Sequence, residues 1–120
     1  MKAVEIIKIG SNFLKKSKIS SHIIDSELLL SKILKKSREE ILINLDKKIH
    51  KEKISRFKKY LYRRSKNEPL AYIFGEKEFW SKKFDVNQDT LIPRPETELL
   101  VDYIVRSYQG KNISILDIGT

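Results

Sequence analysis

The 120-residue sequence has no cysteine, only two histidines and no long apolar run. Without cysteine the chain forms no disulfide, no cysteine-ligated zinc site and no thiol nucleophile. His22 and His50 are too far apart and too isolated to indicate a metal site or a Ser/His triad. A bilayer-spanning helix needs about 20 consecutive apolar residues, and neither such a run nor a signal peptide is present. We therefore expect a cytoplasmic protein without metal or membrane anchor.

Positive charge is abundant and is concentrated in the first half of the chain. Residues 1–66 carry 19 lysines and arginines against 7 acidic residues, whereas residues 67–120 carry 6 against 9, so the net charges are +12 and −3. This change indicates a boundary between two units at 67–69. The densest segment, 47–66, has ten basic residues against Glu52 alone. Such density attracts phosphate polyanions, but lysines often only solvate a helix surface, and we favour that interpretation for most of them.

Helical periodicity dominates the first 66 residues. Apolar residues recur at the spacing of one buried helix face, and Ser37 to Glu40 have the capping-box pattern, in which the serine oxygen and the glutamate each pair an orphan amide. Four helices with short connections are typical of a small bundle. So basic a bundle suits docking better than catalysis. The expected helices cover 3–16, Ser20 or Ser21 to about Lys36, Ser37 to Leu45, and 51–65.

The second half begins with signals for short elements. Residues 69–73 can form one helical turn that ends at Gly75. Residues 77–80 and 83–86 flank Ser81-Lys82, which predicts a β-hairpin. Pro95 suits the first position of a further helix, because a proline there sacrifices no hydrogen bond. That helix should end near 107–110 and direct four apolar side chains toward a core: Leu99, Leu100, Tyr103 and Ile104.

The last eight residues predict a strand followed by an acidic, glycine-containing loop. Residues 113–118 are mostly β-branched and apolar, and they lead into Asp-Ile-Gly-Thr. In doubly wound sheets, a buried strand with this exit opens a nucleotide or adenosyl site, although an ordinary strand-to-turn exit has the same residues. One strand without neighbours cannot form a parallel sheet. We therefore expect the front part of a longer protein, with 108–120 as its least protected segment.

Three ordered blocks resemble one known family, the release-factor glutamine methyltransferases (PrmC/HemK). The blocks are EPLAYIFGEKEFW with the later NQDTL (68–80 and 87–91), IPRPETELLV (92–101) and ILDIGT (115–120). The leucines at 28–30 also resemble the family's N-terminal bundle. The resemblance is sharp from residue 68 onward and loose before it.

The resemblance implies an α+β chain in three parts. Residues 1–66 would form a helical, substrate-docking bundle, residues 67–92 a linker with a β-hairpin, and residues 93–120 the truncated start of a Rossmann-like, class I methyltransferase domain. It also implies S-adenosylmethionine as cofactor. Asp117, Ile118, Gly119 and Thr120 match the start of the cofactor loop. Arg94, Glu96 and Thr97 match a segment near that loop and are candidates for lining the active site.

The implied reaction is methylation of a glutamine side-chain nitrogen in the Gly-Gly-Gln motif of class I peptide chain release factors, a step in translation termination. An amide nitrogen is a poor nucleophile, so the enzyme must position it and accept its N–H groups. The family does this with Asn-Pro-Pro-Tyr, which the chain lacks. We therefore expect no catalytic residue here and no activity from these residues alone.

Two other functions stay open from the sequence. One is a non-catalytic module that docks a release factor, for which charge alone would nominate Lys58, Lys59, Arg63 and Arg64. The other, less favoured, is nucleic-acid binding through 47–66. RNA binding should weaken steeply with salt and ignore the identity of the release factor, whereas protein docking should be specific for its partner.

Overall fold

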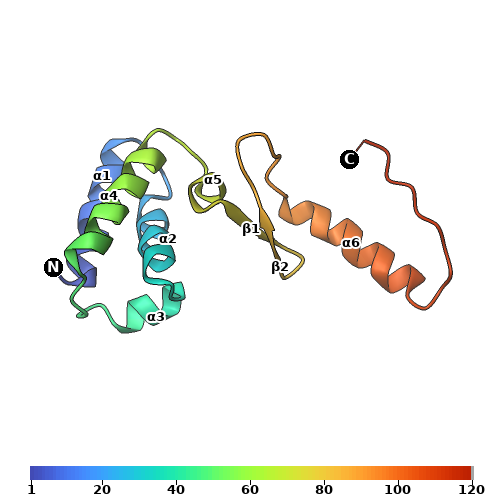
Figure 1. Ribbon diagram of the computed structural model, residues 1–120, viewed down its shortest axis with the longest axis horizontal. Coiled ribbons are helices and arrows are strands. Elements are labelled where there is room, and N and C mark those ends of the chain that lie inside the picture. The colour runs from blue at the N-terminus through green and yellow to red at the C-terminus, as the bar shows by residue number, and fades with distance from the viewer. Residues whose placement is uncertain (120) are drawn as a thin grey trace. The chain divides into compact units, whose positions relative to one another are not determined.

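The structure, a computed structural model, describes residues 1–119 and divides into two compact units, Met1–Gly75 and the part from Glu76 onward. The first unit is helical and the second holds a hairpin and one helix (Figure 1). No helix in the described part is long and apolar enough to cross a membrane. The elements are α1 (Ala3–Lys16), α2 (His22–Leu34), α3 (Arg38–Ile43), α4 (Lys51–Ser65), α5 (Leu70–Phe74), β1 (Glu76–Phe79), β2 (Lys82–Asp85) and α6 (Pro95–Tyr108).

The core of the first unit lies among α1, α2 and α4, whose apolar faces converge. Burying apolar surface stabilises the fold by about 25 cal/mol for each Å² removed from water. This gain outweighs the unfavourable helix propensity of the many isoleucines. The expected capping box is present: the Glu40 amide donates to Ser37 Oγ at 3.1 Å, and the Ser37 amide donates to Glu40 Oε2 at 2.7 Å. The fully or almost fully buried side chains include Ile6, Leu14, Leu29, Leu30 and Phe57.

The expected helices are confirmed in number and type within this unit. Helix α2 begins after Ser21 as expected but ends at Leu34, because Lys35 adopts a left-handed conformation (φ 54°). Helix α3 likewise ends at Ile43, short of the expected Leu45. Helix α5 is the expected single turn, and Gly75 ends it with φ 72°. Ile73, 4% exposed, joins α5 to the bundle core.

The hairpin of the second unit is present, but its turn lies one residue earlier than expected. Phe79 pairs with Lys82, so Trp80 and Ser81 form the two-residue turn. Both have positive φ, 50° and 55°, which is the backbone of a type I′ turn. This turn fits the right-handed twist of a hairpin, and it normally selects Asn-Gly; that signal is absent from the sequence. Phe79 and Phe84 then pack edge to face across the two strands, with their ring centroids 6.1 Å apart.

Helix α6 begins with Pro95 at its first turn, as expected, but it has no buried residue. The expected core contacts of Leu99, Leu100 and Tyr103 are wrong for the described residues: these side chains are 73%, 59% and 65% exposed. The expected strand over 113–118 also does not form. A strand needs neighbours to pair its backbone groups, and the described residues supply none for it. The α+β class is confirmed through the helices and the antiparallel hairpin.

Candidate functional site

The residues predicted to line an active site lie at the start of α6. Arg94 is the N-cap of the helix, and its carbonyl accepts a hydrogen bond from the Thr97 amide at 3.1 Å. The side chains of Arg94, Glu96 and Thr97 are exposed. Glu98, which is not among the candidates from the sequence, makes the structural contact here: its Oε1 accepts a hydrogen bond from the Trp80 amide at 2.8 Å. This bond fixes the hairpin turn to the first turn of α6.

The predicted cofactor-loop residues follow an irregular C-terminal segment. Asp117, Ile118 and Gly119 are exposed, Ile118 to 85%, and Gly119 has the left-handed φ of 81° that glycine adopts readily. Thr120 lies outside the described residues. No hydrogen bond or ion pair within residues 1–119 joins this group to Arg94, Glu96 or Thr97. The structure therefore does not bring the two predicted groups together.

A hollow close to these residues along the chain is mostly apolar. It measures about 340 Å³ and is lined by Ile104 and Tyr108 of α6 and by residues 113–116. It offers no charged group for an aminoacid moiety and ends before Asp117. This hollow therefore does not fit the charged amino-acid part of S-adenosylmethionine. No described cluster of acidic residues and histidines could hold a metal ion.

The end of α4 carries an ion network that sequence analysis missed. Arg64 Nε donates to Asp25 Oδ2 at 2.7 Å, and Ser21 Oγ donates to the same oxygen at 2.9 Å. Arg64 Nη1 also reaches the Glu68 carbonyl at 3.1 Å. The Asp25 and Arg64 side chains are 5% and 18% exposed. The network therefore joins α2, α4 and the segment before α5 inside the bundle.

Arg63 completes the network by binding the Glu68 carboxylate with two nitrogens, Nε at 2.8 Å from Oε2 and Nη2 at Oε1. Nη2 also donates to the Tyr72 carbonyl of α5 at 3.3 Å. The hydrogen bonds from Arg63 lower the pKa of Glu68, although partial burial opposes the shift. The same hydrogen bonds raise the pKa of Arg63. The side chains of Arg63 and Glu68 thus both have hydrogen-bond partners within the chain.

The four basic residues that charge alone nominates for docking fall into two pairs with different surroundings. Arg63 and Arg64 bind carbonyl groups of α5 and of the preceding loop and so hold these segments against the bundle. Lys58 and Lys59 are exposed on α4 and form no ion pair in the part that the structure describes. The two pairs differ in their acidic partners: Arg64 pairs with Asp25, which is distant in the sequence, and Arg63 pairs with the nearby Glu68. A count of charges does not take such partners into account.

Comparison with known proteins shows to which family the chain belongs. Residues 5–75 match the family model for the PrmC N-terminal domain. The release factor glutamine methyltransferase of Buchnera aphidicola subsp. Schizaphis graminum is 47% identical over 96 residues, which are 80% of this chain and 35% of that protein. The one from Coxiella burnetii is 43% identical over 98 residues, 81% of this chain and 35% of that protein.

Similarity is not confined to single-function enzymes. A bifunctional methyltransferase of Rickettsia conorii is 42% identical over 108 residues, 90% of this chain and 21% of that protein. The chain thus spans about a third or less of the length of these three curated relatives. The domain match covers more than half of the 120 residues, and it coincides with the helical unit. The chain therefore belongs to the PrmC N-terminal domain family.

Proposed function

We propose that this chain is the N-terminal part of an S-adenosylmethionine-dependent enzyme that methylates the glutamine of the Gly-Gly-Gln motif in class I release factors. The observation that carries the proposal is the extent of the similarity. Relatives named release factor glutamine methyltransferase match 80–81% of the chain at 43–47% identity, well beyond residues 5–75. The proposed substrate acts in translation termination, so the site of action is the cytoplasm.

In this proposal, residues 1–66 dock the release factor. The bundle surface combines charge with exposed apolar side chains, among them Ile9 at 52%, Phe13 at 42% and Tyr62 at 61%. Ile9 and Phe13 are four residues apart on α1 and so share one face of the helix. Apolar anchors surrounded by charged groups are typical of protein–protein interfaces.

Residues 67–92 form the linker with its hairpin, and residues 93–120 begin the methyltransferase domain. The exposed apolar side chains of α6 support this division, because a helix with no buried residue is stabilised only when its apolar face packs on something else. Asp117, Ile118, Gly119 and Thr120 would contribute the first part of the cofactor loop, and Arg94, Glu96 and Thr97 its surroundings. Catalytic groups would come from beyond these residues, so we expect the 120-residue chain alone to transfer no methyl group.

The second candidate is a release-factor docking module without catalysis. The helical unit favours this candidate, because its apolar core and the ion pair between Arg64 and Asp25 both lie within the unit itself. The two candidates share the docking step and differ only in whether methyl transfer follows. A purely RNA-binding module is the less favoured alternative, resting on the positive charge of 47–66.

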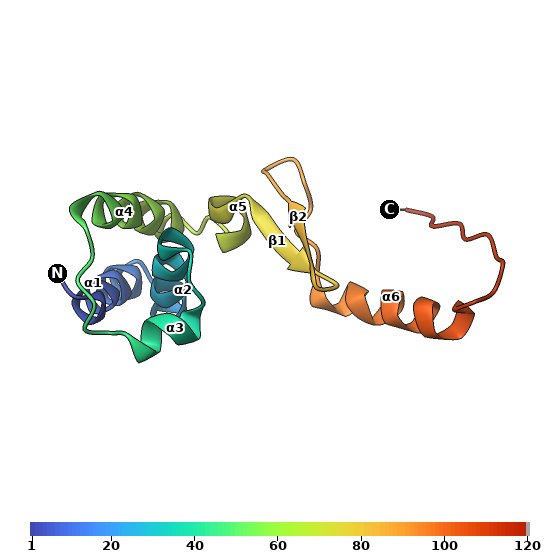
Figure 2. The ribbon, with the colours of Figure 1, turned by 60° about the horizontal axis from the view of Figure 1, so that its bottom comes forward.

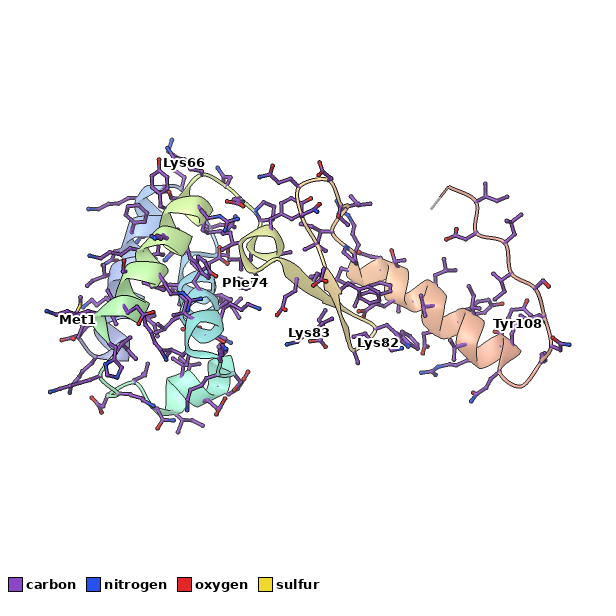
Figure 3. The ribbon with its side chains drawn as sticks, in the orientation of Figure 1. Met1, Lys66, Phe74, Lys82, Lys83 and Tyr108 are labelled. Carbon is purple, nitrogen blue, oxygen red and sulfur yellow. The ribbon has the colours of Figure 1, made fainter. Side chains whose placement is uncertain are left out.

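The docking step is tested by titrating the 120-residue chain with a class I release factor at several salt concentrations. We expect saturable binding whose affinity falls modestly with salt, and amide shifts confined to residues 1–75. The paired variant Lys58→Gln/Lys59→Gln should weaken binding. The control Lys82→Gln/Lys83→Gln removes two exposed charges from β2 (Figure 3) and should not. Absence of binding, or equal weakening by both pairs, would contradict docking through the bundle.

A further inference from the structure

A basic hollow lies at the beginning of α4, away from the network at its other end. It measures about 170 Å³ and is lined by Leu34, Lys36, Lys47, Lys48, Ile49, His50 and Lys53. Figure 2 shows the segment between α3 and α4 passing the N-terminal end of α1 before α4 begins. Hydrogen bonds hold this segment in place: the Ala3 amide donates to the Lys47 carbonyl at 2.9 Å, and the Ile49 amide to the Met1 carbonyl at 3.0 Å.

The positive charge around the hollow is largely uncompensated. Four of the seven lining residues are lysines. Lys36 lies 3.8 Å from the carboxylate of Glu40, and this is the only ion pair that the four lysines make within residues 1–119. Lys47, Lys48 and Lys53 have no carboxylate partner there. Like charges around one hollow repel one another, so an anion that enters the hollow relieves repulsion as well as gaining attraction.

The start of α4 contributes residues to the same hollow. His50, the N-cap, and Lys53, in the first turn, both line the hollow. No side chain caps the helix, so its first amides lack the usual oxygen acceptor. The N-terminus of a 15-residue helix also carries a partial positive charge. Glu52 lies in the same turn and opposes an anion, but it is not among the lining residues.

We infer that this hollow binds a phosphate group. A cavity of about 150 Å³ holds a six-atom benzene ring, so a hollow of about 170 Å³ has room for the five heavy atoms of a phosphate group. Ammonium groups and free helix amides are the donors that phosphate binding uses. The phosphate can belong to a phosphorylated small molecule or to an RNA backbone, because both present the same oxygens. This inference does not depend on the proposed methyltransferase function.

The experiment is a titration of the 120-residue chain with pyrophosphate at constant ionic strength, followed by amide chemical shifts. We expect saturable shifts centred on residues 47–53. The variant Lys47→Gln/Lys48→Gln/Lys53→Gln should bind at least about tenfold more weakly, which corresponds to about 1.4 kcal/mol, because it loses charge-assisted hydrogen bonds to the anion. The matched control Lys8→Gln/Lys15→Gln/Lys16→Gln removes the same charge from exposed positions on α1 that do not line the hollow, and should bind within about threefold of the original chain.

A second arm identifies the source of the phosphate. A 12-nucleotide single-stranded RNA that binds much more tightly than pyrophosphate, is displaced by it and responds to the same triple variant would assign the hollow to an RNA backbone. An RNA that binds no tighter than pyrophosphate would assign it to a small phosphorylated ligand. Equal losses in the two triple variants, or no shifts in residues 47–53, would overturn the inference. Circular dichroism of each variant confirms that the helices are retained.

Discussion

At the scale of single residues, two contacts inside the bundle decide how closely the helices approach. Gly10 lies in the middle of α1, where glycine is unfavourable, and a Cβ there would lie 2.5 Å from Ser26 Oγ and 2.7 Å from Phe57 Cζ. Ser26, fully buried, donates to the Ile7 carbonyl at 2.9 Å. By sequence alone, Gly10 is only an unfavourable residue within a helix. Its role depends on residues 16 and 47 positions away, which periodicity does not reveal.

Replacing Gly10→Ala should therefore destabilise the bundle. Alanine improves helix propensity by about 1 kcal/mol, but an extra methyl group in a packed core costs about 1–3 kcal/mol, and both neighbours here are fully or almost fully buried. We expect a net loss, measured as a lower midpoint of urea unfolding. The exposed Asn12→Ala on the same helix is the control and should leave the midpoint unchanged or raise it. Stabilisation by Gly10→Ala would contradict the close approach.

The ion network gives a second prediction at this scale. Arg64→Met leaves the Asp25 carboxylate, whose side chain is 5% exposed, without its charged partner. Removing one partner of a buried pair costs about 3–5 kcal/mol. Arg56→Met, at an exposed position of the same helix, should change the free energy of unfolding by less than about 0.5 kcal/mol. Equal effects of the two substitutions would show that Asp25 is not held by Arg64.

The stability of the fold should also decrease as the pH is lowered, because Glu68 becomes protonated. Its pKa in the folded chain is lower than the ordinary value of 4.5, because Arg63 donates hydrogen bonds to the ionised carboxylate. The stabilisation is therefore complete above pH 4.5 and is lost as the pH falls below it toward the folded pKa. Unfolding midpoints measured from pH 6 to pH 3 should decline less steeply in Glu68→Gln than in the original chain. Parallel declines would contradict the assignment.

At the scale of elements, the helices of the first unit follow from local pattern alone. Their apolar spacing and the Ser37 capping box predict type and position, and only the ends of α2 and α3 differ. The hairpin is predictable too, but its register is not, because Trp80-Ser81 carries no type I′ signal. The predictions of a strand over 113–118 and of a buried apolar face on α6 are wrong for another reason. Both structures need neighbouring strands, which no local pattern supplies.

Hydrogen exchange should separate these elements. Amides of α1, α2 and α4 lie in the helices that surround the buried core, so they should exchange only through large-scale unfolding. Amides of α6, which has no buried residue, and of 108–119 should exchange much faster. Mass spectrometry of peptic fragments measures both groups in one sample. Protection of 113–118 equal to that of α2, in a monomeric sample, would contradict the unpaired segment seen here.

At the scale of the whole molecule, charge and structure divide the chain at similar places. The change of net charge at 67–69 and the end of the helical unit at Gly75 are separated only by α5 and its preceding loop, which Arg63 and Arg64 tie back to the bundle. The predicted cofactor and active-site residues have no comparable support within residues 1–119. Their placement depends on a sheet, and a sheet is a property of several segments together.

The most direct test of the proposed function is a graft into a related enzyme. Residues 1–75 would replace the matching residues of the Buchnera aphidicola release factor glutamine methyltransferase, which is 47% identical over the aligned region. Methyl transfer from labelled S-adenosylmethionine to a class I release factor is then compared with that enzyme lacking its N-terminal domain. We expect the graft to restore transfer that the shortened enzyme has lost, mainly by lowering KM for the release factor, while the 120-residue chain alone transfers nothing. A graft that binds the cofactor normally yet methylates no better than the shortened enzyme would contradict release-factor docking by this domain.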